Sequence, residues 1–99
     1  MMRKDEIKEV DVTKVGNIPS SRLNEELALV DEPFWYYLIE ATDADGNVER
    51  EESGLAWLKK SERAIILWNE QIVWTRAESP QDAAERWLED RMETPPVFQ

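Results

Sequence analysis

The chain has 99 residues, with 22 acidic against 12 basic side chains and a formal net charge of −10. It contains neither cysteine nor histidine, which excludes disulfides, thiolate nucleophiles, zinc–sulfur sites and catalysis that depends on histidine. The acidity disfavours direct binding to nucleic acid or to anionic lipid and favours protein partners with basic surfaces.

The length suits one domain with one modest core, and five tryptophans can supply much of its apolar area. No apolar run reaches the ~20 residues of a membrane span, and the first residues lack the apolar stretch of a signal peptide. No motif in the sequence calls for a cofactor. We therefore expect a cytoplasmic protein that neither contacts a membrane nor carries a cofactor.

Residues 1–18 mix charged side chains with isolated apolar ones and follow neither the helical nor the strand period. This pattern leaves open a short strand over Val10–Val15 behind a frayed start. The domain itself is expected over residues 19–93, followed by a tail over residues 94–99.

The first predicted helix follows this N-terminal segment. Ser20 and Ser21 are N-cap candidates, because a serine hydroxyl can accept hydrogen bonds from the free N–H groups of a first turn. Leu23, Leu27 and Val30 then follow at i, i+4 and i+7, which predicts one apolar face on a helix of two to three turns.

A first hairpin is predicted from Phe34 onward. Phe34–Ile39 is rich in aromatic and β-branched residues and apolar on both faces, which is typical of a buried strand. Asp45-Gly46 favours a hairpin turn. The return segment begins with charged residues and becomes apolar at Leu55–Leu58, so we expect the turn end of the hairpin to lie in solvent.

The same turn also resembles the first half of an EF-hand calcium loop. Asp43, Asp45 and Asn47 match the first three ligand positions. The second half does not match, because Val48 stands where the loop needs glycine and Gly54 stands where it needs glutamate. We therefore predict a turn and no metal site.

A second hairpin is predicted around Asn69-Glu70, which separates two apolar runs. If these two residues form the loop, the facing pairs are Leu67 with Ile72, Ile66 with Val73 and Ile65 with Trp74. Glutamate in place of the usual glycine leaves a longer loop open. Both strands are apolar on both faces, so each face needs a cover, either a helix, the N-terminal segment or a partner protein.

The last predicted helix has a clear start, with Ser79 as N-cap, Pro80 at the first position and Asp82 at the third. Arg86 can pair with Asp82 or Asp90, four residues away on either side. The apolar stripe of this helix comprises Ala84, Trp87, Leu88 and Met92. The order helix, hairpin, hairpin, helix predicts an α+β domain, in which an antiparallel sheet of about four strands, with room for a fifth from the N-terminal segment, packs against both helices.

Side chains on the last helix and the first hairpin are our candidates for partner binding. Three of the helix carboxylates are spaced by roughly 5–10 Å, which overlaps the phosphate spacing of a nucleic-acid strand. The aromatic candidates can instead belong to the core or line a cleft for a flat ligand. The candidates are Asp82, Glu85, Glu89 and Asp90 for electrostatic contacts, and Trp35 and Tyr37 as apolar anchors.

The leading functional hypothesis is a non-enzymatic domain that docks on a basic surface of a partner protein, in one form by covering a nucleic-acid-binding site. The alternative is an accessory subunit of a homodimer or larger complex, in which the acidity serves solubility. The third hypothesis is a carboxylate-based hydrolase that uses Asp43 with Asp45 or Glu51 with Glu52. It ranks last because such a pair acts as acid and base only inside a cleft that raises the pKa of one carboxyl group. No catalytic residue is predicted.

Overall fold

The computed structural model describes residues 2–17, 19–50 and 53–90. Within these ranges the chain forms six strands, two α-helices and one short 3-10 helix. In chain order the elements are η1 (Lys4–Glu6), β1 (Ile7–Val15), α1 (Ser21–Glu26), β2 (Trp35–Asp43), β3 (Val48–Glu49), β4 (Gly54–Leu58), β5 (Arg63–Trp68), β6 (Gln71–Arg76) and α2 (Pro80–Glu89).

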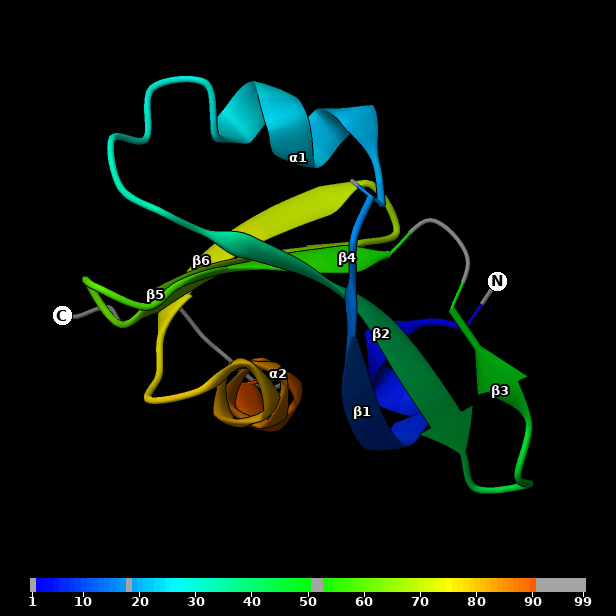
Figure 1. Ribbon diagram of the computed structural model, residues 1–99. Helices are drawn as coiled ribbons and strands as arrows, with labels where there is room; N and C mark the ends of the chain where they lie inside the picture. Colours follow the sequence, from blue (N-terminus) through cyan, green and yellow to red (C-terminus); the bar gives the residue numbers. More distant parts are fainter. Residues whose placement is uncertain (1, 18, 51–52, 91–99) are drawn as a thin grey trace, which may run out of the picture.

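The strands form one antiparallel sheet in the order β1, β2, β4, β5, β6, and the short β3 pairs with the far end of β2. Figure 1 shows α1 above the sheet and α2 below it, so the molecule has three layers. The predicted α+β class is confirmed, including a fifth strand from the N-terminal segment and the two helices that pack against the sheet.

Each face of the sheet has its own core, because successive strand residues point to opposite faces. Ile66 and Trp68 face α2, whereas Ile65 and Leu67 face α1, as the alternation of β5 predicts. The core under α2 contains Met2, Ile7, Val10, Ile39, Ala41, Leu55, Trp57, Ala64, Ile66, Trp68, Ala77, Ala83, Ala84, Trp87 and Leu88. The core under α1 contains Leu23, Leu27, Ala56, Leu58, Ile65 and Leu67.

The second hairpin has the predicted two-residue loop. Asn69 and Glu70 have φ angles of 53° and 66°, the left-handed conformation that such a loop requires at both positions. The facing pairs of β5 and β6 are those predicted, from Leu67 with Ile72 to Ile65 with Trp74.

Strand β1 is longer than the sequence predicts and starts at Ile7 instead of Val10. The added length is stabilised by burial, since Ile7 and Val10 are both in the core. The chain before it is also held, because the indole Nε1 of Trp68 donates to the Met2 carbonyl oxygen at 3.0 Å. Charged residues interrupt the apolar ones in this segment, so the hydrophobic periodicity of the sequence does not reveal the full length of the strand.

The return half of the first hairpin is split into β3 and β4, where the sequence predicts one strand. Between them, the buried hydroxyl of Ser53 donates to the carbonyl oxygens of Ile39 and Arg50, at 3.1 and 2.9 Å. Ile39 pairs with Val12 of β1, but on the other side of β2 neither β3 nor β4 pairs with it. The Ser53 hydroxyl satisfies its carbonyl oxygen instead, which allows the strand to break.

Both helices are capped by the predicted serines. Ser20 accepts from the Arg22 amide, and Ser79 accepts from the Asp82 amide. Helix α1 is shorter than predicted because it ends at Glu26, although its apolar stripe packs on the sheet as expected. In α2 the buried stripe is confirmed up to Leu88, and Met92 lies outside the described residues. None of the helices described here has the length and apolarity needed to cross a membrane.

Candidate protein-binding surface

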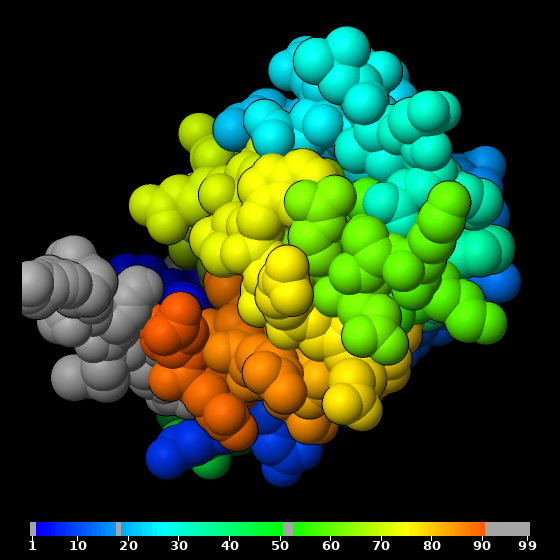
Figure 2. Space-filling model, turned by 90° about the vertical axis from the view of Figure 1, so that its left-hand side faces the viewer, coloured from blue at the N-terminus to red at the C-terminus, as the bar shows by residue number. Residues whose placement is uncertain are grey.

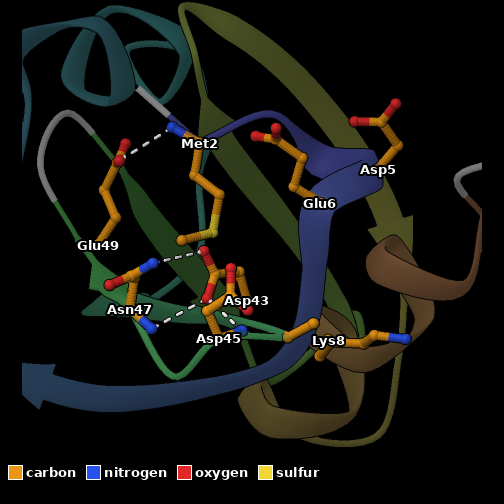
Figure 3. Close-up of a pocket in the computed structure, with 9 residues that line it drawn as sticks. Met2, Asp5, Glu6, Lys8, Asp43, Asp45, Asn47 and Glu49 are labelled. Carbon is orange, nitrogen blue, oxygen red and sulfur yellow. Dashed lines mark hydrogen bonds between the residues drawn. The ribbon is translucent and has the colours of Figure 1, made fainter.

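Five carboxylates line a hollow of about 530 Å³ where η1, the start of β1 and the β2–β3 turn meet. Figure 3 shows the side chains around it, with Lys8 at its rim. The Met2 amide donates to the Glu49 carboxylate at 2.9 Å, which fixes one wall of the hollow. The carboxylates belong to Asp5, Glu6, Asp43, Asp45 and Glu49.

The turn that borders this hollow is built around the Asp43 carboxylate. Its Oδ1 accepts from the backbone amides of Asp45 and Asn47, both at 2.9 Å, and its Oδ2 accepts from the Asn47 side chain at 3.0 Å. These hydrogen bonds, above all those from Asn47, lower the pKa of Asp43 below its ordinary value. Gly46 has φ +86°, so the turn needs a residue that tolerates the left-handed region.

This geometry bears on the calcium and hydrolase hypotheses. The Asp43 oxygens accept hydrogen bonds from their own turn, and the described residues contain no group of three or more acidic side chains arranged to hold a metal ion. A lowered pKa is also the opposite of what a carboxylic general acid requires. The pair Glu51 and Glu52 lies outside the described residues.

A second hollow, of about 400 Å³, runs between the outer edge of β1 and helix α2. Four carboxylates line it, two from each element, together with Lys8. The strand contributes Glu9 and Asp11, and the helix contributes Glu85 and Glu89.

The two hollows share Lys8 and together form one acidic surface across the start of β1. Among the described residues, the only ion pair that involves a carboxylate of this surface joins Arg3 and Asp5, at 3.7 Å and in an exposed position. The surface therefore keeps most of its negative charge for an external cation. We define the acidic surface as Asp5, Glu6, Glu9, Asp11, Asp43, Asp45, Glu49, Glu85 and Glu89.

A side chain of α2 fixes the helix against β1. The Gln81 Nε2 donates to the Val10 carbonyl oxygen at 2.8 Å, and its Oε1 accepts from the Val12 amide at 3.1 Å. The amide thus pairs with the outer edge of β1 as a neighbouring strand would. Its Nε2 also donates to Glu85 at 2.9 Å, which holds that carboxylate beside the groove.

The four helix carboxylates predicted to bind a partner do not all lie together. Glu85 and Glu89 belong to the acidic surface, and Asp90 is exposed at the C-cap of α2. Asp82 pairs instead with Arg86, Nε to Oδ2 at 2.9 Å, and accepts from the Glu78 amide. The Glu78 hydrogen bond first, and Arg86 after it, lower the pKa of Asp82.

The two predicted aromatic anchors lie farther along β2. Trp35 is 37% exposed, and the Nζ of Lys14 lies 5.6 Å from its ring centroid. Tyr37 is half-buried against the core under α2, and burial raises its pKa. Trp35 precedes Glu40, the partner of Asp11, by five positions in β2, which is roughly 17 Å at the rise of a strand. Trp35 is thus a separate feature from the acidic surface.

Sequence reasoning missed the four acidic residues of the N-terminal segment, Asp5, Glu6, Glu9 and Asp11. It took its candidate carboxylates from the last helix alone and left the first 18 residues outside the domain. The alternation of Glu9 and Asp11 with the buried Val10 was the available signal, because it is the pattern of a half-buried strand.

Comparison with protein-family models, with curated proteins and with solved structures found no match to this chain.

Proposed function

We propose that the protein is a non-enzymatic binding domain whose acidic surface docks on a basic surface of a partner protein. The observation that carries this proposal is the gathering of nine acidic residues from three separate stretches of the chain, 5–11, 43–49 and 85–89, around one lysine. Such clustering costs folding energy through mutual repulsion, so its retention favours a role in recognition. The partner would contribute the missing cations.

In its sharper form, the proposal names a partner site that otherwise binds nucleic-acid phosphates. Acidic residues of a strand and of a helix line the two sides of one groove. A row of negative charges at several-ångström spacing resembles the charge pattern of a phosphate backbone. A Lys- or Arg-rich groove that accepts nucleic acid would then accept this surface.

The test compares two variants with the same change in charge as baits for proteins from a cell lysate. Glu85→Gln with Glu89→Gln neutralises the helix side of the acidic surface. Glu25→Gln with Glu26→Gln, on the exposed side of α1, is the matched control. We expect a protein that is retained by the parent and the control at about 50 mM salt, and lost with the first variant and at about 500 mM salt.

Equal retention by the two variants, or no retained protein at low salt, would contradict the proposal. The sharper form has its own test, since the retained protein, once purified, should bind nucleic acid and release it when the parent domain is added. A retained protein without affinity for nucleic acid would leave the general proposal and remove the sharper one.

A further inference from the structure

Strand β6 forms an outer edge of the sheet with no strand beyond it in the described part of the chain. In Figure 2 it is seen in yellow at the surface, between α1 in cyan and α2 in orange. The Ala77 amide donates to the Glu62 carbonyl oxygen, which shows that odd-numbered residues direct their backbone groups toward β5. The backbone groups of Ile72, Trp74 and Arg76 therefore point outward, where they can pair with a further strand.

The side chains along this edge are unusually apolar for a surface strand. Val73 is 37% exposed and Trp74 is 40% exposed, on opposite faces of the sheet. An uncovered strand with large apolar side chains is a template for strand pairing unless charges or a bulge prevent it. Within β6 only the last residue, Arg76, is charged, and the described residues offer it no ion pair.

We propose that two copies of this chain pair antiparallel through β6, with the two-fold axis at Val73. In this register every facing pair is complementary: Ile72 faces Trp74, Gln71 faces Thr75, and Glu70 faces Arg76 of the second copy. The outward backbone groups of Ile72 and Trp74 then form hydrogen-bonded pairs, and Val73 meets its own copy in a non-hydrogen-bonded pair. The sheet continues across the axis into the second molecule.

The neighbouring registers are worse. Backbone direction allows only shifts that move the axis by whole residues, and moving it to Trp74 sets Ile72 against Arg76 and Glu70 against Glu78. Like charges that face each other directly are destabilising, and an apolar side chain gains little from a guanidinium. Moving the axis to Ile72 sets Gln71 against Val73 and Glu70 against Trp74, so the order acid, amide, apolar, apolar, apolar, hydroxyl, base is self-complementary only about Val73.

The carboxylate of Glu70 is a second observation that supports this interface. The φ of Glu70, 66°, is the left-handed conformation that the two-residue loop requires, and its carbonyl oxygen accepts from Arg22 Nη1 at 2.9 Å. The Glu70 carboxylate, in contrast, has no hydrogen bond or ion pair in the described residues. In the dimer it faces Arg76 of the other copy. The inference is independent of the proposed function, because the acidic surface lies at the other edge of the sheet.

Cysteine scanning gives the sharpest test, because the natural chain has no cysteine. In Val73→Cys the two introduced cysteines face each other at a Cα separation of about 4.5 Å, which suits a disulfide. In the control Gln71→Cys the same two positions are displaced by four residues, roughly 13 Å. Mild oxidation should therefore link most of the first variant and little of the second, as judged on a non-reducing gel.

An equal mixture of Gln71→Cys and Thr75→Cys should form linked heterodimers, since these positions face each other across the Val73 axis. Linked heterodimers in a mixture of Val73→Cys and Thr75→Cys, in place of linked Val73→Cys homodimers, would put the axis at Trp74 and overturn the proposed register. No preferential linking in any of these combinations would overturn the interface.

A charge reversal tests the same interface in the chain without cysteine. Arg76→Glu makes Glu70 of each copy face a glutamate of the other copy, so two acidic pairs replace two ion pairs. Dimerisation should weaken about tenfold or more in a sedimentation dilution series. Adding Glu70→Arg restores both pairs with exchanged signs and should restore the affinity. A parent that stays monomeric at all concentrations, or a double variant that stays as weak as the single one, contradicts the proposal. Retention of the monomeric fold is checked by the circular dichroism of each variant.

Discussion

The two outer edges of the sheet differ, because the β1 edge is covered and the β6 edge is open in the described residues. At β1, the Gln81 amide occupies the outward backbone groups of Val10 and Val12, and α2 lies beside the strand. At β6, the outward backbone groups have no such partner in the described residues, and large apolar side chains surround them. The first edge carries carboxylates and the second carries apolar side chains that end in an arginine.

This difference shows that one small sheet can separate two kinds of contact. The edge covered by a helix is unavailable for strand pairing, so its side chains can act only through charge. The uncovered edge is short of charge and can act through its backbone. The two interactions should consequently differ in their response to salt, which should weaken the first much more than the second.

Two tryptophans should separate the edges most clearly. Trp87 of α2 is 4% exposed and packs on Trp68 with ring centroids 5.8 Å apart. Trp87→Ala should lower the free energy of unfolding by about 3–5 kcal/mol, as expected for a large side chain removed from a core. Trp74→Ala, at the open edge, should cost only about 1 kcal/mol, mainly through its contact with the Arg63 guanidinium, 4.9 Å from the ring. Urea unfolding at low protein concentration, where the monomer dominates, measures both.

Two glutamines offer a finer comparison. Gln81→Ala removes two hydrogen bonds to β1 and should destabilise the fold by about 1–3 kcal/mol. It should also speed hydrogen exchange of the Val12 amide. Gln71→Ala, exposed on β6, should change stability by less than about 0.5 kcal/mol. Similar losses in the two variants would mean that Gln81 does not close the edge.

The left-handed residues of the two turns should respond to substitution with opposite signs. Gly46, in the turn beside the acidic surface, has φ +86° and no atom within 4 Å of an added Cβ. Gly46→Val should thus cost about 1–2 kcal/mol from backbone strain alone. If the melting temperature did not change, the turn would have another conformation in solution.

At Glu70, beside the open edge, substitution should raise the free energy of unfolding instead of lowering it. Glu70→Gly relieves the same strain and should stabilise the monomer by about 0.5–1 kcal/mol, while the loss of its carboxylate weakens the dimer. Chemical unfolding of the monomer and sedimentation of the dimer give the two readings. A variant that is more stable in both assays would show that Glu70 has no role at the interface.

The smallest effect concerns pH. Because the folded state lowers the pKa of Asp43, this group stabilises the fold above the unfolded value of about 3.8 and loses its contribution as the pH falls through the lower, folded value. The urea midpoint of the parent should therefore decrease below about pH 4, and Asp43→Asn should remove part of that decrease. Asp45→Asn is the control, since its side chain accepts no hydrogen bond in the described residues.

The parts of the fold that sequence reasoning found are those specified by neighbours along the chain. The register of β5 and β6 followed from two apolar runs around Asn69, and the start of α2 followed from Ser79 and Pro80. The acidic surface was found only on its helix side, at Glu85 and Glu89. Glu9 lines the same hollow as these two residues because β1 is the edge strand next to β2 and α2 packs beside β1. This arrangement is determined by contacts between residues that are distant in the sequence.

The break between β3 and β4 had the same origin, because Ser53 reaches a carbonyl of another strand. No local pattern distinguishes a serine that makes such a contact from one in a solvent-exposed loop. The length of β1 was missed for a related reason, since its charged residues look unstructured until Gln81 and β2 are placed on its two sides.

The contact between Gln81 and β1 also has a consequence during translation. Val10 and Val12 precede Gln81 by 71 and 69 residues, so the ribosome must add most of the domain before this edge can be closed. At a synthesis rate of about 5–20 residues per second, roughly 4–14 s pass between the synthesis of β1 and that of Gln81, which covers its edge. During that interval the charges at Lys8, Glu9 and Asp11 are what discourage pairing between neighbouring nascent chains.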